Sequence, residues 1–577
     1  MISILGKIWQ KRGTDHEALQ NIMSGYGVSE IVGAILSNRA LPEGVGNFLL
    51  PKISKQMPDP FSLLDMKKAV DRFIKAIENK EKICLFADYD VDGATSAALL
   101  VRFLLHLKVE HFVYIPDRIK EGYGLSVAAL EAISFKASCI VTLDCGSGAY
   151  AEVAFAASKG LDVIVIDHHI ADKMLTDAVA VVNPNRIDET SDLQYLAAVG
   201  VTYLFLVGVV SHLRVKAKYA AILESFDLLL MLDLVALGTV CDVVPIVGLN
   251  RAFVHQGLKV IRMRTNLGIR TLIDCVNLQE HIRAYHLGFV LGPRINAGGR
   301  VGNSDLGVKL LTTNCKVQAE QISQGLDEYN TQRKTIESQM LKQAQSIVES
   351  QELKSMIIVE SDEWHVGVMG IVASRLVDLY RLPVAVIAWQ GNIGKGSCRS
   401  VTGFDFGAAM LSAKSLGLVL NGGGHKMAAG FTVDKSCFDE LKTFLYKNAL
   451  RNIDQQKLPY YFDATLTLES LQMCLLDQID ILEPFGSGNP IPSFNIQNVT
   501  VVYAKIVGEN HVYCILGTSE NHRHRVTATA FGAMHNKLGM ILLSKTKAPI
   551  SVIVTLQRHS WAGDEKVRCI IKDVIES

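Results

Sequence analysis

Short apolar runs alternate with stretches of helical pattern between Lys82 and about Val247. The runs are mainly aliphatic and β-branched, which is typical of strands buried on both faces of a sheet. Strands that alternate with helices favour a largely parallel sheet with helices on both sides. The predicted strands are residues 82–87, 111–115, 139–143, 162–166 and 178–182.

Two further blocks follow along the chain. Residues 315–350 place apolar side chains three and four positions apart, which predicts one long amphipathic helix that connects two lobes. A second α/β block is expected over residues 351–454. Its predicted features are strands at 356–360 and 384–388 and glycine-rich turns at 394–396 and 422–424.

The two ends of the chain have different patterns. Residues 1–75 are predicted to form a mostly helical extension, broken by several prolines. From residue 455 to 577, short β-like runs separated by glycine and polar residues predict a small barrel. We therefore predict an α/β multidomain protein: a parallel-sheet domain over 76–314, the connecting helix, the second α/β domain and a C-terminal β-barrel.

Composition narrows the class of protein. The chain has 577 residues, 49% of them hydrophobic, and a net charge of zero, so several packed cores are expected and any polyanion site must be a local patch. The eleven cysteines show no metal-finger spacing, which favours free thiols in a reducing compartment. The uncharged segment 193–213 contains polar and small residues, so we expect a buried helix there and a soluble, cytoplasmic protein.

An acidic string, Asp88-Tyr89-Asp90-Val91-Asp92-Gly93, follows the first predicted strand directly. An EF-hand loop is excluded because its twelfth position, Leu99, is not the bidentate glutamate that such a loop requires. Two interpretations stay open for this string alone: a metal site, or a solvated acidic turn at a helix N-terminus, where the helix dipole favours carboxylates.

Other strand ends carry similar residues. Asp144-Cys145-Gly146 follows strand 139–143, and Asp167-His168-His169 follows strand 162–166. The carboxyl ends of parallel strands meet at one edge of a sheet, where ligands usually bind. Asp242 interrupts the apolar stretch 236–245, and a buried carboxylate without a partner is costly.

Aspartate and histidine together suit Mn²⁺, Mg²⁺ or Zn²⁺, and the oxygen-rich balance here favours the harder ions, Mn²⁺ or Mg²⁺. The strand-end residues are numerous enough for two ions. Two adjacent ions activate water for attack on phosphorus. The expected reaction is hydrolysis of a phosphoester or phosphoanhydride.

These strand-end motifs resemble the DHH phosphoesterase superfamily, whose members use two Mn²⁺ or Mg²⁺ ions. Later motifs, at residues 292–300, 396–400 and 422–430, make the chain similar to the superfamily's RecJ family of bacterial single-strand-specific 5′-to-3′ DNA exonucleases. The resemblance implies a DHH domain, the long helix, a DHHA1 domain and a C-terminal OB fold that binds nucleic acid.

The resemblance also implies roles for single residues. Metal ligands would be Asp88, Asp90, Asp92, Asp144, His168 and Asp242, with Asp88 as ligand or supporting residue. Catalysis would involve Asp90, Asp92, His168 and His169, with His169 facing the scissile phosphate. Substrate-binding residues would be Arg118, Arg294, Asn296, Arg300, Ser397, Arg399 and His425; arginine suits this role because its fork grips phosphate.

Four aromatic residues of the predicted barrel are candidates for base stacking: Tyr503, Tyr513, Phe531 and Trp561. Aromatic residues of small barrels more often pack in the core, and we expect core packing for these four. The resemblance implies single-stranded DNA, a RecQ-type helicase and a single-strand-binding protein as partners, in DNA repair and recombination. No association with a membrane is expected. Two alternative functions stay open: a phosphoesterase acting on short oligonucleotides or pyrophosphate, which would not need the barrel, and a non-catalytic single-strand-binding protein.

Overall fold

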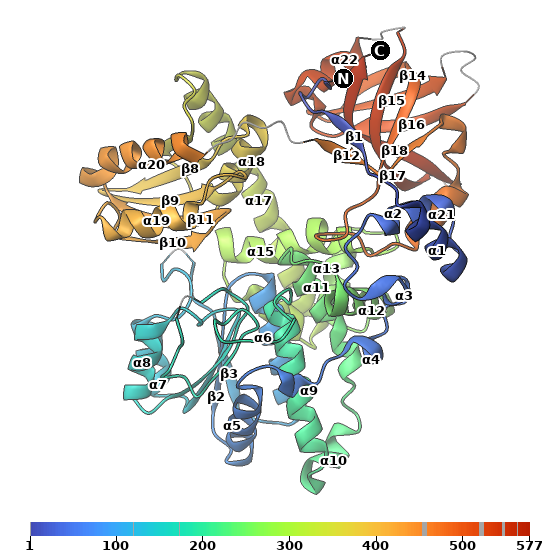
Figure 1. Cartoon of the computed structure of the whole chain (residues 1–577). Coiled ribbons are helices and arrows are strands. Elements are labelled where there is room, and N and C mark those ends of the chain that lie inside the picture. The colour runs from blue at the N-terminus through green and yellow to red at the C-terminus, as the bar shows by residue number, and fades with distance from the viewer. Residues whose placement is uncertain are drawn as a thin grey trace. The chain divides into compact units, whose positions relative to one another are not determined.

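The computed structural model describes residues 2–118, 120–171, 173–452, 459–518, 524–544, 548–561 and 564–576 (Figure 1). The chain divides into two compact units. One comprises Pro58–Asp242 and Gly257–Gln455, and the other comprises Met1–Met57, Val243–Gln256 and Gln456–Ser577. The N-terminal residues therefore share a unit with the C-terminal region. The predicted domain limits stay predictions.

The first unit contains the predicted parallel sheet. Its strands lie in the order β3-β2-β4-β5-β6, all parallel, and the apolar runs form the strands as predicted because most of their side chains are buried. The bounds are β2 Ile83–Ala87, β3 His111–Tyr114, β4 Cys139–Leu143, β5 Asp162–Ile166 and β6 Ala180–Val182.

Helices surround this sheet and extend the same unit. The uncharged segment forms the buried helix α9 (Ala198–Arg214), and no helix in the described part of the chain is long and apolar enough to span a membrane. The helices before the second sheet are α5 Met66–Glu78, α6 Val91–His106, α7 Val127–Ser134, α8 Tyr150–Ser158, α10 Ala217–Leu223, α11 Leu232–Cys241, α13 Leu267–Cys275, α14 Ala284–His286, α15 Gly292–Val301 and α16 Leu306–Thr312, with the π-helical turn η3 Leu287–Leu291. Helix α12 (Gly248–Met263) is divided between the two units at Gln256.

The predicted connecting helix is a single element, α17 (Lys316–Glu349). After it comes a five-stranded mixed sheet in the order β10-β11-β9-β8-β7. Its elements are β7 Ile357–Ser361, α18 Met369–Tyr380, β8 Val384–Gln390, β9 Ile393–Arg399, α19 Phe406–Ser415, β10 Asn421–His425, β11 Ala428–Asp434 and α20 Phe438–Asn452.

The prediction of glycine-rich turns in this block was wrong. Residues 394–396 lie in β9 and residues 422–424 lie in β10. Cross-strand packing explains Gly396, because a Cβ there would lie 2.2 Å from the ring of Phe431 on the neighbouring strand. The glycine makes room for an aromatic ring, and the sequence alone does not distinguish this from a turn.

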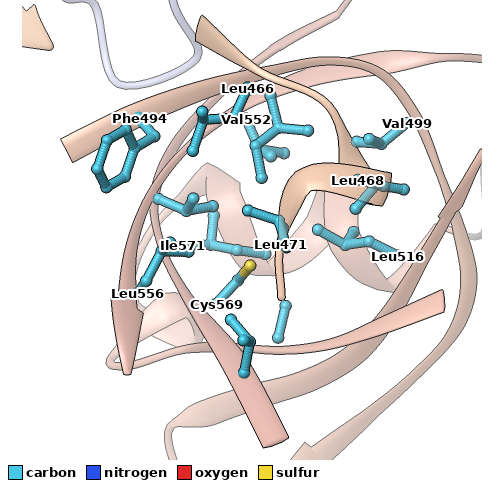
Figure 2. Packing of buried hydrophobic residues seen from close by; sticks show 14 of the residues in the cluster. Leu466, Leu468, Leu471, Phe494, Val499, Leu516, Val552, Leu556, Cys569 and Ile571 are labelled. Atoms are coloured by element: carbon cyan, nitrogen blue, oxygen red, sulfur yellow. The ribbon is translucent and has the colours of Figure 1, made fainter. Parts of the chain in front are cut away.

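The second unit contains the predicted barrel. The strands are β13 Ala464–Leu466, β14 Ser493–Val507, β15 His511–Thr518, β16 Arg525–Ala530, β17 Ile550–Trp561 and β18 Asp564–Glu576. Pairing of β14 with both β15 and β17 closes the sheet. Aliphatic side chains and Phe494 fill the interior (Figure 2). Strand β18 was not predicted, because charged residues interrupt its apolar pattern.

The core position expected for the barrel aromatics was wrong for two of them. Tyr503 is 45% exposed and Phe531 is 56% exposed, because aliphatic residues already occupy the interior. Tyr513 is half-buried, and the side chain of Trp561 lies outside the described set.

The N-terminal helices pack against the barrel core within this unit. Ile22, Val32 and Phe48 belong to the same apolar cluster as Phe494 and Leu516. The elements are β1 Trp9–Lys11, α1 His16–Tyr26, α2 Glu30–Ser37, α3 Gly44–Leu49, α4 Ile53–Gln56, β12 Tyr460–Phe462, α21 Met473–Asp480 and α22 Lys537–Leu543, and β1 pairs in parallel with β12.

Candidate metal centre

The acidic string forms the turn between β2 and α6. Asp90 caps the helix, because its Oδ1 accepts hydrogen bonds from the backbone N–H groups of Asp92 at 2.9 Å and Gly93 at 3.1 Å. Gly93 is needed for space, since a Cβ there would lie 2.4 Å from the carbonyl oxygen of Asp88. The turn therefore presents three carboxylates at the carboxyl end of β2.

The neighbouring strands bring the other predicted residues to the same edge. In the sheet, β2 lies next to β4, and β4 lies next to β5, so Asp144 and the Asp167-His168-His169 string follow adjacent strand ends. Asp144 has a φ of 62°, a left-handed conformation that is uncommon for aspartate. Such backbone outliers often mark functional positions.

His168 lies at the centre of the carboxylate cluster. Its Nε2 is 3.4 Å from Oδ1 of Asp144, 3.7 Å from Oδ2 of Asp242 and 4.0 Å from Oδ2 of Asp92. The ligand atoms form three overlapping groups, each small enough to surround one ion: Asp92 with His168 and Asp242, Asp88 with Asp90 and Asp144, and Asp144 with His168 and His169.

Several of these atoms are buried and have no hydrogen-bond partner in the described part of the chain. They are Asp88 Oδ1, Asp144 Oδ1, His168 Nε2 and Asp242 Oδ2. Polar atoms that are both buried and unsatisfied are rare in folded proteins unless an ion or water completes them. The acidic turn is also not solvated, because Asp92 is 1% exposed. The donor set therefore fits a cation site and not a solvated turn.

The carboxylates repel one another when no cation is present. Burial, reinforced by the Asp90 carboxylate, raises the pKa of Asp92 to about 7, even though the amides of Val199 and Ala198 donate hydrogen bonds to it. Burial and the neighbouring Asp92 raise the pKa of Asp242 to about 9. A bound cation would remove the cost of ionising both groups.

A backbone contact fixes the orientation of His168. Its Nδ1 lies 3.2 Å from the carbonyl oxygen of Leu196, to which it donates when protonated there, so Nε2 is left as the lone-pair nitrogen that faces the carboxylates. Burial lowers the pKa of His168 to about 4, which favours the neutral form that binds metal. This arrangement is the usual one for a histidine ligand supported by a hydrogen bond.

His169 has a different environment. Its Nδ1 lies 2.8 Å from Oδ1 of Asp167, and despite burial this carboxylate raises the pKa of His169 to about 9. Asp167 also accepts from the backbone N–H groups of Ser147 and His168. Burial opposes ionisation of Asp167, but the His169 side chain, helped by the Ser147 N–H, holds its pKa below the usual value. Asp167 thus orients the His169 ring through Nδ1 and favours its protonated form, which suits contact with an anion better than coordination of a metal.

Three predicted substrate-binding arginines belong to the first domain, and one of them differs from the other two in being paired with a carboxylate. Arg118 lies with its guanidinium 4.9 Å from the Tyr89 ring centroid. Arg300 donates to the carbonyl of Gly367, and burial together with the nearby Arg118 lowers its pKa to about 10. Arg294 instead pairs with Asp327 on α17 at 2.8 Å. Arg118 and Arg300 therefore place positive charge near the acidic turn, whereas the charge of Arg294 is paired with Asp327.

Asn296 forms a hydrogen bond with the backbone of the acidic turn. Its Oδ1 accepts a hydrogen bond at 3.1 Å from the backbone N–H of Val91, the first residue of α6. One lone pair of this side-chain oxygen is therefore engaged by the acidic turn. This contact indicates a role for Asn296 in orienting the acidic turn.

The second sheet places Ser397 and Arg399 beside the first turn of α18. A Cβ at Gly370 would lie 2.9 Å from Nη2 of Arg399 and 3.0 Å from Oγ of Ser397, so glycine is required for this approach. A helix N-terminus flanked by a hydroxyl and a guanidinium is suited to binding an anion. His425, at the end of β10, is exposed and accepts from the Met427 N–H through Nδ1.

Residues outside the predicted set also shape the centre. Asn183 donates to the carbonyl of His169 at 2.8 Å, and Asn185 donates to the carbonyl of His168 at 2.7 Å. Tyr123 donates to the carbonyl of Asp144 at 3.1 Å. Asn183 directly follows the predicted strand 178–182 and Asn185 comes two residues later, so the strand-end argument, applied to this strand, points to this segment.

Family comparisons match three regions of the chain. Residues 82–239 match the DHH family N-terminal domain, residues 353–449 match the DHHA1 domain, and residues 462–573 match the RecJ OB domain. These regions correspond to the first sheet, the second sheet and the barrel.

Characterised proteins match over most of the chain. The single-stranded-DNA-specific exonuclease RecJ of Bacillus subtilis is 31% identical over 99% of this chain and 71% of its own length. The Haemophilus influenzae protein of the same name is 34% identical over 80% of this chain and 82% of its own length. The crystal structure of RecJ from Thermus thermophilus in complex with Mn²⁺ is similar with a TM-score of 0.81, 26% identity, and coverage of 99% and 80% of the two chains.

Proposed function

Because the chain belongs to the RecJ family of single-stranded-DNA-specific exonucleases, we propose that it removes nucleotides from the 5′ end of single-stranded DNA by hydrolysis of the phosphodiester. The observation that carries this proposal is the cluster of buried, unsatisfied carboxylate and imidazole atoms around His168. A protein of this fold that only bound DNA would have no use for such a costly group of charges.

We further propose that Asp88, Asp90, Asp92, Asp144, His168 and Asp242 hold two Mn²⁺ or Mg²⁺ ions. RecJ structures from Thermus thermophilus are in complex with each of these ions. When bound, such a pair lowers the pKa of water and offsets the negative charge on a phosphate. Asp144 and His168 each belong to two of the three ligand groups. Asp144 has two carboxylate oxygens and could contribute to both ions, whereas His168 has one lone pair, at Nε2, and would bind one of them.

His169 is proposed to hold its proton at Nε2 and to donate it as a hydrogen bond to a non-bridging phosphate oxygen. Its Nδ1 is already engaged by Asp167, which keeps the ring oriented and positively charged. A fixed cation at this place would stabilise the charge that develops on the phosphate during the reaction.

Arg118, Arg300, Ser397, Arg399 and His425 are proposed to hold the 5′ end of the strand. Arg118 lowers the pKa of both Arg300 and Arg399, in addition to the effect of burial, so their positive charges interact. A group of repelling guanidinium ions is suited to a phosphate, which would relieve the repulsion. Arg294 and Asn296 are proposed to act through Asp327 and the acidic turn, respectively.

The wider context is also a proposal. Within this family assignment, the protein acts in the cytoplasm in DNA repair and recombination. There it digests strands that a RecQ-type helicase unwinds and that a single-strand-binding protein covers.

The test uses DNA labelled at the 5′ or the 3′ end, single-stranded or as a blunt duplex, incubated with the protein and Mn²⁺. The expected result is early release of the 5′ label from the single strand and little digestion of the duplex. Early release of the 3′ label would overturn the direction, and equal digestion of the duplex would overturn the strand preference. Activity on pyrophosphate or short oligonucleotides alone would favour the alternative phosphoesterase.

A further inference from the structure

A cavity of about 470 Å³ opens on the unit that contains the barrel. It lies between the residues that follow β1, those that follow α2, strand β12 and parts of β14, β17 and β18. Its volume falls within the range of pockets that bind small ligands. All of its lining residues belong to this one unit.

Positive charge exceeds negative charge in the cavity. Arg12, Arg39 and Lys572 line it together with one carboxylate, Asp463. Asp463 is already engaged, because Oδ1 lies 3.5 Å from Nε of Arg12 and Oδ2 accepts from the backbone N–H of Ser493 at 2.8 Å. Among the described residues, neither Arg39 nor Lys572 forms an ion pair.

The guanidinium of Arg39 is only partly satisfied. Its Nη2 donates to the carbonyl of Pro490 at 2.7 Å, whereas its buried Nη1 has no hydrogen-bond partner within the described ranges. Burial lowers the pKa of Arg39 to about 10, although Asp463 opposes this effect. A buried donor that lacks an acceptor is the second observation that points to an anionic ligand.

Aromatic and apolar groups lie beside these cations. Tyr461 is 43% exposed and Ile491 is 46% exposed, and both line the cavity. The guanidinium of Arg12 lies 5.3 Å from the centroid of the Tyr461 ring. An exposed ring next to a cation is a stacking platform, and base stacking on such rings tolerates any sequence.

We propose that this cavity binds one nucleotide unit of a single DNA strand, with the phosphate at Arg39 and Lys572 and the base against Tyr461. The proposal rests on the proposed function and adds a second contact for the same substrate, on the barrel unit. A guanidinium fork and an ammonium match a phosphate, and the exposed tyrosine matches a base. The free 5′-mononucleotide that the reaction releases has the same chemistry.

The test measures binding of fluorescent oligothymidylate to the full-length protein in EDTA, which prevents hydrolysis. Lys572→Glu and Tyr461→Ala are each expected to raise the Kd about tenfold, whereas Tyr461→Phe retains the ring and the affinity. Lys52→Glu is the matched control, since Lys52 is an exposed lysine of the same unit outside the cavity, and it is expected to change the Kd less than about twofold.

A second arm uses an oligonucleotide that carries 5-iododeoxyuridine, which forms a photochemical cross-link to stacked aromatic residues. A cross-link at Tyr461 supports the proposal. An unchanged Kd in both Lys572→Glu and Tyr461→Ala would overturn it. Equal affinity for thymidine monophosphate and the oligonucleotide would assign the cavity to the free nucleotide, and competition by polyglutamate but not by unlabelled DNA would assign it to an acidic protein.

Hydrolysis of a short single strand with Mn²⁺ separates failure of this proposal from failure of the proposed function. The unaltered protein is expected to degrade this strand. If the unaltered protein does not degrade the short strand, the proposed function fails, whatever the binding experiment shows.

Discussion

Nε2 of His168 lies 3.4 Å from Oδ1 of Asp144, and neither atom has a hydrogen-bond partner within the described part of the chain. The imidazole is held by the Leu196 carbonyl, and Asp144 is held in a left-handed backbone conformation. The His168 ring and the Asp144 backbone are therefore held by the chain itself. Preorganised ligands of this kind make the metal centre sensitive to small changes in the turns that carry them.

Gly93→Ala is expected to disturb the acidic turn. The added Cβ would lie 2.4 Å from the Asp88 carbonyl oxygen, which is backbone and must shift. We expect a loss of about 1–3 kcal/mol in the free energy of unfolding, together with weaker Mn²⁺ binding. Gly148→Ala is the control, because a Cβ there meets nothing within 4 Å. Denaturant unfolding and Mn²⁺ titration measure both effects, and equal behaviour of the two variants would contradict this account.

The metal-free protein is expected to lose stability as the pH rises. The pKa values of Asp92 and Asp242 in the folded protein are about 7 and about 9, above the value of about 4 in an unfolded chain. The folded state therefore holds more protons than the unfolded state between about pH 4 and pH 9, so the free energy of unfolding falls across this range.

Asp242→Asn removes one of these carboxylates and should reveal its effect. In EDTA the variant is expected to match the unaltered protein near about pH 5 and to be more stable by about 1–3 kcal/mol near about pH 9. Added Mn²⁺ should reverse the order, because asparagine is the poorer ligand. Thermal unfolding at the two pH values is the measurement. A variant that is less stable in EDTA near pH 9 would argue against the proposed repulsion.

Arg399→Ala is expected to weaken binding of the substrate without weakening binding of the metal. The guanidinium lies beside the first turn of α18 and outside the three ligand groups. We expect the KM for a 5′-phosphorylated strand to rise about tenfold or more, while the Mn²⁺ affinity stays unchanged. Arg375→Ala, which removes a largely exposed arginine paired with Glu337, is the matched control. Loss of Mn²⁺ affinity in Arg399→Ala would refute the role assigned to this residue.

Much of the centre could be predicted from the sequence, because its ligands follow strands whose pattern is unambiguous. Asp88 and Asp144 come directly after predicted strands and His168 follows one residue later, and parallel pairing brings these strand ends to one edge. Asp242 could be predicted for a different reason, as a charge that interrupts an apolar stretch, and it lies directly after α11. In each case a local pattern determined the position.

The features that the sequence did not predict depend on distant contacts. The need for glycine at residue 396 comes from the ring of Phe431, which lies on the neighbouring strand but far along the chain. Strand β18 is hidden because exposed charged residues, among them Glu565, Lys566 and Lys572, interrupt its apolar pattern. Tyr503 is exposed because side chains from other strands fill the barrel interior. The pattern of its own segment does not predict this.

The most direct test of the account is the rate at which 5′-labelled nucleotide is released from single-stranded DNA in Mn²⁺ by Asp144→Asn and by the unaltered protein. Asp144 belongs to two of the three ligand groups, so we expect the variant to be at least about a hundredfold slower. Asp177→Asn, at an exposed aspartate outside the centre, should be as active as the unaltered protein. Full activity of Asp144→Asn would contradict a metal centre at this edge of the sheet.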